Sequence, residues 1–323
     1  MRILITGATG FIGSEVARQL ASAGLRPRVM VRRPNRAALL DGLDLEAVYG
    51  DLTLPDTLHA AVDGCDAVIH LGGRAVFEPA KRLEPTFVAG TRALADAAAA
   101  AGARRFVFGS SLLVHGPSFE AITADSVPDP AIDYGRIKLR MERELAERGD
   151  LSVASIRLPH VYGAGDQLFV NVRRGVLAVP GRSSPPFSHL HVSDAARVLI
   201  AAAMNTWEGA CGIGDRDPAG WDRFLGELQR LLPRLVVVRL PAALALAGTS
   251  LMRVVRSRLE TPDIFTPDTV RAWNMPLWVD PDLLWDEFGL EPEVPDYTVG
   301  LKRSLDDAVD RVWRHSLQDH RRV

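Results

Sequence analysis

Two side chains near the middle of the chain, Tyr134 and Lys138, have the types and the spacing to move a proton. They lie four residues apart in a segment with helical periodicity, Ile132 to Arg148, so a helix would present both on one face. A phenol with a pKa of about 10 exchanges protons poorly at neutral pH unless a nearby cation stabilises the phenolate. The pair therefore predicts an acid–base centre. The alternative for such a pair alone is a packed tyrosine beside a solvated lysine.

Hydroxyl groups that could join this centre lie upstream. A strand is expected at Arg105 to Phe108, and Gly109, Ser110 and Ser111 follow it. In open α/β sheets, ligands bind at the carboxyl ends of the strands, so these serines fall where a substrate would be held. Turn residues without a chemical role are the alternative.

The chain opens with three glycines that could hold a nucleotide. An apolar strand, Arg2 to Thr6, precedes Gly7, Gly10 and Gly13, and a helical segment, Ser14 to Ala23, follows. Such a turn exposes unpaired N–H groups and a partial positive charge at the start of the helix, and both suit a pyrophosphate. The spacing is a variant of the dinucleotide fingerprint, and a plain turn is the alternative.

Strands and helices alternate through the first half of the chain. This alternation predicts right-handed βαβ units and an α/β fold of Rossmann type, with a doubly wound parallel sheet. We expect residues 1–163 to form the dinucleotide-binding domain, and some later segments to return to its sheet. Residues 164–315 should mainly form a smaller substrate-binding lobe, and residues 316–323 a charged tail. Further strands are expected at Arg28 to Val31, Leu45 to Tyr49, Asp66 to Leu71 and Leu151 to Arg157, and a long helix at Leu83 to Ala101.

Two helices are expected near the end of the chain. Asp280 is expected to cap the first of them, with Pro281 in its first turn and Gly289 at its end. Tyr297 to His315 has the apolar spacing of an amphipathic helix.

Composition limits the classes of partner. The chain has 323 residues and a net charge of −2, with 38 basic against 40 acidic residues. This balance argues against a nucleic-acid groove or an anionic membrane surface and favours small-molecule partners. Cys65 and Cys211 lie far apart without metal-ligand spacing, so no metal is expected and a reducing compartment is favoured. Neither an apolar leader nor a membrane-spanning stretch is visible, so we expect a cytoplasmic protein.

Together these segments resemble the extended short-chain dehydrogenase/reductase family, within the NAD-dependent epimerase/dehydratase superfamily. The resemblance covers nearly the whole chain, and its motifs are specific in combination. The matching segments are Thr6 to Gly13, Gly50 to Leu52, Asp66 to Leu71, Gly90 to Arg92, Gly109 to Gly116, the Tyr134/Lys138 pair, Arg157 to Gly163 and His191 to Asp194.

The resemblance implies a role for individual residues. Tyr134 would be the general acid/base, Lys138 would lower its pKa and bind the nicotinamide ribose, and Ser111 rather than Ser110 would orient the substrate oxygen. The implied cofactor-binding positions are Gly7, Thr9, Gly10, Phe11 and Ile12 in the glycine turn, Asp51 and Leu52 beside the adenine, Leu71, Gly72 and Gly73 along the cofactor, Pro159, His160 and Val161 facing the nicotinamide, and Tyr134 and Lys138.

The sequence departs from the family pattern at three places. Phe87 stands where the family usually has an asparagine, which puts an asparagine-dependent water relay in doubt. Gly72 and Gly73 replace two common alanines and would widen the space near the cofactor. His115 replaces a frequent tyrosine; we expect it to pack, and the alternative is that it faces the substrate.

The residues after the second strand indicate which dinucleotide is bound. NAD-binding proteins of this type carry a carboxylate about 20 residues after the glycines, where it holds the ribose 2′-hydroxyl. Arg32, Arg33 and Arg36 stand in this region instead, and guanidinium groups suit a 2′-phosphate. We therefore expect NADP, with NAD as a second option; a solvated arginine turn is the alternative.

One function that fits this pattern is an NADP-dependent oxidoreductase. It would transfer a hydride between nicotinamide and a carbonyl or secondary alcohol of an apolar substrate that is steroid-like, β-keto acyl or flavonoid-like. The resemblance is nearest to the 3β-hydroxysteroid dehydrogenase-like and dihydroflavonol reductase-like branches. The apolar segment Pro241 to Leu259, with Trp273, Trp278 and Trp285, would either line its pocket or form core.

Two other functions stay open. A nucleotide-sugar epimerase or dehydratase would need cations for the substrate diphosphate, and Arg253, Arg256 and Arg258 could supply them. A non-catalytic, NADP-sensing protein of the same fold would not need Ser111, Tyr134 and Lys138 together. The family also implies a homodimer through the helices expected at Leu83 to Ala101 and Ile132 to Arg148.

Overall fold

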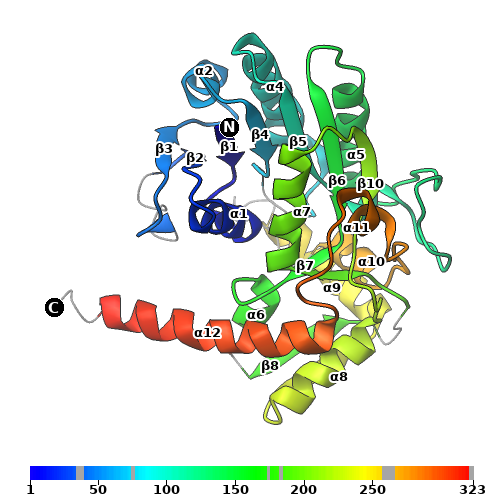
Figure 1. Ribbon diagram of the computed structural model, residues 1–323. Helices are drawn as coiled ribbons and strands as arrows, with labels where there is room; N and C mark the ends of the chain where they lie inside the picture. The colour runs from blue at the N-terminus through cyan, green and yellow to red at the C-terminus, as the bar shows by residue number, and fades with distance from the viewer. Residues whose placement is uncertain (34–39, 74–76, 173–174, 182–184, 257–265, 320–323) are drawn as a thin grey trace.

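Among the residues that the structure describes, seven strands form one parallel sheet (Figure 1). The structure is a computed structural model that describes residues 1–33, 40–73, 77–172, 175–181, 185–256 and 266–319. The strand order reverses between β1 and β4, which places a ligand crevice at the carboxyl ends of these two strands. Across the sheet the strands are β10 (Gly209–Gly212), β6 (Ser152–Leu158), β5 (Arg105–Ser111), β4 (Ala67–His70), β1 (Ile3–Thr6), β2 (Arg28–Val31) and β3 (Glu46–Tyr49). The predicted Rossmann-type fold is confirmed.

Helices cover both faces of this sheet and bury its central strands. Every residue of β1, β2, β4 and β5 is buried, which agrees with the apolar runs at their centres and the lack of alternation. One face packs against α1 (Phe11–Ser22), α7 (Val192–Met204) and α11 (Leu283–Phe288). The other packs against α2 (Leu58–Val62), α3 (Ala80–Glu84), α4 (Gly90–Ala100) and α5 (Asp133–Ala146).

The prediction of one long helix at Leu83 to Ala101 is wrong, because the helix is interrupted there. A π-helical turn, Pro85–Ala89, separates α3 from α4. Pro85 has no N–H and its ring crowds the preceding turn, so a regular helix cannot run through it. The interruption carries Phe87, which is 3% exposed, into the core beneath α5.

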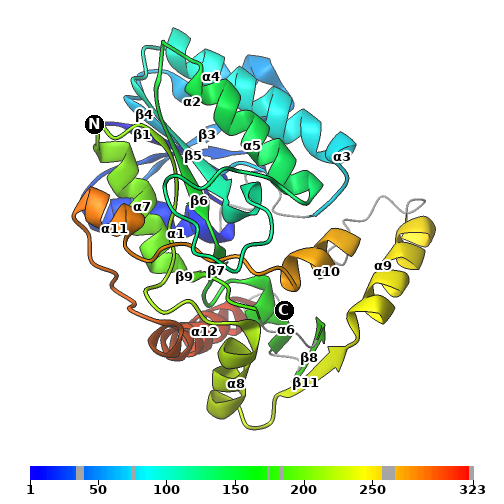
Figure 2. The same cartoon turned by 90° about the vertical axis from the view of Figure 1, so that its right-hand side faces the viewer.

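A second, smaller lobe lies beside the carboxyl ends of the strands (Figure 2). It has its own apolar core and two two-stranded parallel sheets, β7 (His160–Tyr162) with β9 (His189–His191) and β8 (Val176–Pro180) with β11 (Val236–Leu240). Its helices are α6 (Gln167–Val172), α8 (Trp221–Leu231), α9 (Ala242–Arg256), α10 (Pro267–Trp273) and α12 (Tyr297–Asp319). Between them, α7 and β10 return to the main sheet. The boundary at residue 163 stays a prediction.

The ends of three helices differ from those expected. Helix α1 already begins at Phe11, and α12 continues past His315 to Asp319. Helix α11 begins at Leu283, so the residue before it is Asp282 rather than Asp280, no side chain caps it, and Pro281 lies before its first turn. The Asp280 carboxylate instead accepts a hydrogen bond from the Asp282 N–H at 3.2 Å. The predicted end of α11 is confirmed, since Gly289 adopts the left-handed conformation at φ 58°. In the described parts of the chain, no helix is both long and apolar enough to cross a membrane.

Candidate active site

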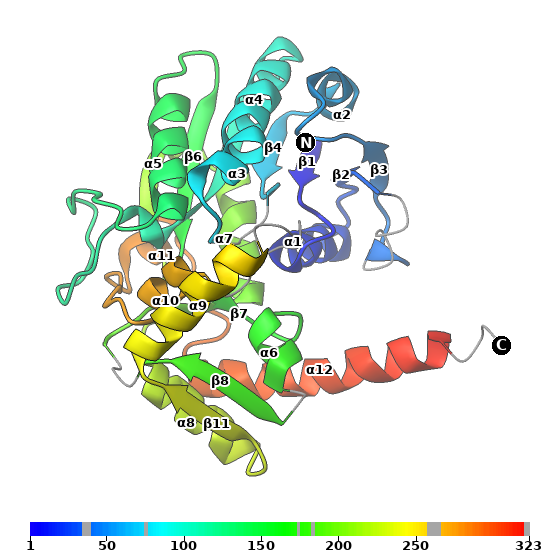
Figure 3. The same cartoon turned by 180° about the vertical axis from the view of Figure 1, so that it is seen from behind.

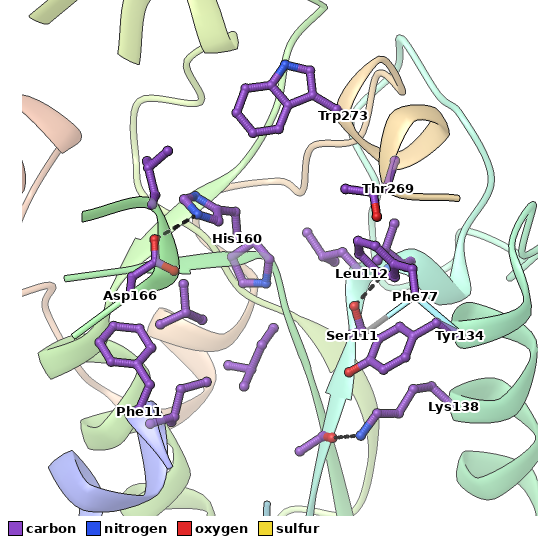
Figure 4. A pocket seen from close by; sticks show the side chains of 18 of the residues that line it. Phe11, Phe77, Ser111, Leu112, Tyr134, Lys138, His160, Asp166, Thr269 and Trp273 are labelled. Carbon is purple, nitrogen blue, oxygen red and sulfur yellow. Dashed lines mark hydrogen bonds and ion pairs between the residues drawn. The ribbon is translucent and has the colours of Figure 1, made fainter. Parts of the chain in front are cut away.

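A cavity of about 700 Å³ lies between the sheet and the lobe. It runs from the glycine turn past Ser111, Tyr134 and Lys138 to the apolar side chains of the lobe (Figure 4). Of the predicted cofactor-binding positions, nine besides Tyr134 and Lys138 line it: Gly7, Gly10, Phe11, Ile12, Leu71, Gly73, Pro159, His160 and Val161. The cavity therefore brings the predicted acid–base residues and most of the predicted cofactor site together.

The glycine turn has the close packing and the free N–H groups that a dinucleotide needs. Gly7 is in the left-handed region at φ 72°, and a Cβ there would lie 2.5 Å from the carbonyl oxygen of Leu71. A Cβ on Gly13 would overlap the Gly7 carbonyl, so α1 can start this close to β1 only without side chains at both positions. No side chain caps α1 at Gly10, so the first-turn N–H groups are left for an anion. These residues fit the pyrophosphate of a dinucleotide.

Tyr134 projects from the first turn of α5 into the cavity. In Figure 4 its hydroxyl lies between the side chains of Ser111 and Lys138. Its ring makes T-shaped contacts with Phe77 and Phe87, with centroid distances of 5.6 and 5.8 Å. These contacts hold the phenol in one orientation, which a positioned proton donor requires.

Lys138 is buried and is held by backbone and rings rather than by a carboxylate. Its Nζ donates to the Gly109 carbonyl oxygen at 2.6 Å and lies 4.8 and 4.5 Å from the ring centroids of Phe87 and Phe108. Burial lowers the pKa of Lys138 to about 7.

The expected lowering of the Tyr134 pKa is not found in this structure. Burial raises the pKa of Tyr134 above its usual value. The neighbouring Lys138 ammonium donates to the Gly109 carbonyl and stands 5.7 Å from the centroid of the tyrosine ring. Tyr134 is therefore protonated at neutral pH, the state from which a phenol donates a proton.

Ser110 and Ser111 belong to β5 itself and not to a turn after it. Both pair with β6, so the strand expected to end at Phe108 continues to Ser111. Successive strand residues point to opposite sides. The Ser110 hydroxyl donates to Glu142 at 2.5 Å, whereas Ser111 Oγ accepts from the Leu113 N–H at 3.2 Å. This difference supports Ser111 as the serine that can donate to a substrate oxygen.

His115 packs, as expected. It is 3% exposed, and its Nε2 lies 3.1 Å from Nη1 of Arg157. Arg157 in turn donates to the buried carboxylate of Glu142 at 2.8 Å. Burial and the neighbouring Arg157 charge lower the pKa of His115 to about 4.

The remaining predicted cofactor residues lie outside the cavity lining. Arg32 and Arg33 are exposed just after β2, and Arg32 Nε is 3.9 Å from Oδ2 of Asp51. Arg36 lies outside the described residues. Thr9 is part of the glycine turn, and Leu52 packs over Gly72, whose N–H donates to Thr6.

The lobe lines the cavity with different residues from those expected. Helix α9 lies on the outer side of the lobe (Figure 3), where Leu244 is 66% exposed. Trp285 is buried in the core of the main sheet, and Trp278 donates to a loop carbonyl, so only Trp273 of the expected tryptophans lines the cavity. The side chains of Arg253 and Arg256, and all of Arg258, lie outside the described residues. The lobe wall contains Leu177, Val179, Phe187, Trp221, Trp273 and Leu277.

Sequence reasoning missed most of this wall. The helical spacing of Trp221, Phe224 and Leu228 in α8 could have marked them as buried, but not as lining a cavity. Asp166 was also missed, because Gly163 to Asp166 has the composition of an ordinary turn.

The chain is similar in sequence to known proteins. The chain matches the family model described as NAD dependent epimerase/dehydratase family over residues 3–212. A ceramide reductase from Caulobacter vibrioides is 33% identical over 273 residues, a match that covers 81% of this chain and 81% of the relative. A 3 beta-hydroxysteroid dehydrogenase/Delta 5-->4-isomerase from Mycobacterium tuberculosis is 33% identical over 225 residues, which is 63% of this chain and 60% of the relative.

Solved structures share the fold at lower identity. A short-chain dehydrogenase/reductase superfamily protein from Agrobacterium tumefaciens with bound NAD aligns with a TM-score of 0.70 at 22% identity, covering 100% of both chains. MoeE5 in complex with UDP-glucose and NAD aligns with a TM-score of 0.76 at 24% identity, covering 97% of this chain and 100% of that chain. The family model and the ceramide reductase match lead to one conclusion. The chain belongs to the NAD-dependent epimerase/dehydratase family and is an NAD(P)-dependent enzyme.

Proposed function

We propose that this enzyme is an NADP-dependent oxidoreductase that interconverts a carbonyl and a secondary alcohol on an apolar substrate. The observation that carries this proposal is the position of Ser111, Tyr134 and Lys138, which stand between the glycine turn and the apolar wall of the lobe in one cavity. A cofactor held at the glycine turn and a substrate held by the lobe would meet at these three residues.

In this proposal each of the three residues has one task. Bound nicotinamide supplies or accepts the hydride. Tyr134, whose pKa burial keeps high, donates a proton to the developing alkoxide in the direction of reduction. Ser111 donates a hydrogen bond to the same substrate oxygen, and Lys138 holds the ribose and stabilises the phenolate that the transfer leaves.

The charge at the end of β2 supports NADP over NAD. Arg32 and Arg33 are exposed there, and their guanidinium groups suit a 2′-phosphate in charge and geometry. Asp51 Oδ2 lies 3.9 Å from Arg32 Nε, so this carboxylate can help to orient the guanidinium.

The chemistry of the cavity wall favours an apolar substrate. Among the cavity-lining residues that the structure describes, Lys138 is the only lysine or arginine, and it is bonded to the Gly109 carbonyl. A nucleotide-sugar epimerase or dehydratase would need cations for the substrate diphosphate. The ceramide reductase and the steroid dehydrogenase are named for apolar substrates, which also supports this choice.

Two further proposals concern the catalytic state and the assembly. Ser111, Tyr134 and Lys138 all line the cavity, which supports an enzyme rather than a cofactor sensor. We also propose a homodimer through α4 and α5, which lie side by side and are joined by the Arg92–Glu144 ion pair, with a second pair between Asp96 of α4 and Arg148 just after α5. Sedimentation of the purified protein tests the dimer.

Turnover assays test the proposed function directly. Thermal shift with NADPH and NADH would identify the cofactor, and steroid-like, β-keto acyl and flavonoid ketones would be compared with UDP- and dTDP-sugars as substrates. We expect stoichiometric NADPH consumption with an apolar ketone. Conversion of a nucleotide sugar without net consumption of cofactor would contradict the proposal and support an epimerase or dehydratase.

A further inference from the structure

The cavity contains a second pair of polar side chains, His160 and Asp166, that the transfer of hydride and proton does not use. His160 is the first residue of β7, and Asp166 lies in the turn before α6. Both line the cavity, and Nε2 of His160 is 3.5 Å from Oδ2 of Asp166. Figure 4 shows this pair across the cavity from Ser111 and Tyr134.

The hydrogen-bond network shows which nitrogen of His160 is left to bond a group in the cavity. Nε2 of His189 lies 2.8 Å from the Ala219 carbonyl oxygen, which can only accept, so this nitrogen carries the proton. Burial lowers the pKa of His189 well below its usual value, so its Nδ1 is a bare acceptor. His160 Nδ1 lies 3.0 Å from that atom and must therefore be a donor. Only Nε2 of His160 is left for a group in the cavity.

A small polar group beside Nε2 and Asp166 could bond to both of them. At 3.5 Å the two atoms are too far apart for a hydrogen bond of ordinary length. In the described part of the chain, Asp166 Oδ2 has no hydrogen-bond partner. A hydroxyl both accepts and donates, so it can accept from a protonated Nε2 while it donates to the carboxylate, or donate to a neutral Nε2.

Aromatic side chains hold the His160 ring in this position. Its centroid is 4.8 Å from that of Trp221 and 5.9 Å from that of Phe224. The surrounding wall is apolar, with Leu177, Val179 and Phe187 nearby in the same cavity. Few side chains in the described lining can hydrogen-bond a ligand; they include Ser111 and Tyr134 at one end, His160 and Asp166 at the other, and Thr269, whose hydroxyl is already bonded to Thr266.

We propose that His160 and Asp166 form a hydroxyl-binding subsite. The preferred substrate is then an apolar molecule that carries, besides the reacting carbonyl or alcohol, a separate hydroxyl on the far side of the cavity. This inference rests on the proposed function, because it assumes that the reacting oxygen lies at Ser111 and Tyr134. The backbone of Pro159 to Val161 remains available to the cofactor, while the His160 side chain serves the substrate.

Matched ligands test the subsite. Dihydrotestosterone would be compared with the androstanone that lacks its hydroxyl, and a long-chain methyl ketone with a terminal hydroxyl would be compared with the same ketone without it. Both kcat/KM and binding, from quenching of tryptophan fluorescence, would be measured. For at least one pair, we expect the wild type to prefer the hydroxylated member by about 10- to 100-fold.

The variants separate a binding role from a structural one. His160→Asn keeps a donor toward His189 and removes Nε2, and Asp166→Leu keeps the branched shape but removes both carboxylate oxygens. Each should reduce the preference, taken as the ratio of kcat/KM for the two members of a pair, to about onefold. For Asp166→Leu the unhydroxylated ketone should also keep its wild-type kcat/KM, whereas for His160→Asn the ratio alone is the readout, because His160 also belongs to the predicted cofactor site. His160→Gln should retain part of the preference, because its amide reaches the Nε2 position. His59→Gln and Asp56→Asn, on the exposed surface, are the controls.

Two outcomes distinguish the subsite from the proposed function. The subsite is wrong, even though reduction proceeds, if the wild type has the same kcat/KM for both members of each pair. It is also wrong if the variants lower kcat/KM by the same factor for both members. If the wild type binds the hydroxylated member more tightly by fluorescence but reduces neither, the proposed function is wrong and the subsite stands.

Discussion

Gly73 leaves the space that the ring of Phe87 occupies: a Cβ on Gly73 would lie 2.5 Å from Cε1 of Phe87. Both residues depart from the family pattern, so the two departures compensate for each other. The Phe87 ring in turn contacts Tyr134 and lies under the Lys138 ammonium. An apolar ring thus supports the acid–base pair at the position where the family usually has a polar amide.

We predict that Gly73→Ala and Phe87→Asn are not additive. Gly73→Ala alone should lower stability and turnover, because its methyl group meets the ring and because Gly73 has a φ of 135°. Adding Phe87→Asn should relieve the overlap but not the backbone strain. The relief should appear as a coupling free energy between the two substitutions of about 1 kcal/mol or more in urea unfolding. Gly102→Ala is the control, since Gly102 has a φ of 81° with nothing within 4 Å of its Cβ position. Strict additivity would show that the two residues are independent.

The fold was predictable from the sequence because local signals and the sheet agree. The apolar strands β1, β2 and β4, the glycine turn and the Tyr134/Lys138 pair all depend on short-range pattern. The same reasoning missed the break at Pro85, because a run of helix-forming residues on both sides hid the effect of one proline.

The substrate side of the site was not predictable in the same way. Its wall is built from β8, α8 and α10, which are distant in sequence and whose relative positions depend on tertiary packing. Apolar composition alone pointed to α9, but a helix rich in alanine and leucine can equally well lie at the surface, as Leu244 does.

Cofactor preference should depend on the arginines after β2. Replacing Arg32 and Arg33 together with Ala should weaken NADPH binding by about 1 to 3 kcal/mol per lost charge-assisted contact and leave NADH binding little changed. Fluorescence titration of both nucleotides measures this. Arg26→Ala with Arg104→Ala, at the amino ends of β2 and β5, is the matched control. An equal loss for both nucleotides would rule out a contact with the 2′-phosphate.

Lys138→Arg should reduce both NADPH affinity and turnover, each by at least about 10-fold. The buried ammonium fits between Phe87 and Phe108 and donates to the Gly109 carbonyl, and a planar guanidinium is too large for this space. Nucleotide titration and steady-state kinetics measure the two effects. The exposed Lys302 offers the control Lys302→Arg. Wild-type values for Lys138→Arg would mean that Lys138 has only a packing role.

His70 should make stability depend on pH in the acid range. Burial, with a smaller contribution from the Lys138 charge, lowers the pKa of His70 from 6.5 to about 3. Between these values the unfolded chain binds a proton that the folded chain does not, so stability falls as the pH falls, at up to about 1.4 kcal/mol per pH unit.

His70→Gln should flatten this slope, while hydrogen bonds to Thr6 and Thr91 can be kept. Urea unfolding of both proteins across this pH range measures the difference, with His59→Gln, an exposed histidine, as control. Parallel stability curves for the wild type and His70→Gln would show that His70 does not contribute to the pH dependence.

The most direct test of the proposed mechanism is the rate of NADPH oxidation in a single turnover of Tyr134→Phe with a ketone that the wild type reduces. The substitution keeps the ring and its contacts with Phe77 and Phe87 but removes the proton placed for the developing alkoxide. We predict an unchanged Kd for NADPH and a rate lower by roughly 10²- to 10⁴-fold. A rate close to that of the wild type, at any pH at which both proteins are folded, would contradict the role of Tyr134 as the proton donor.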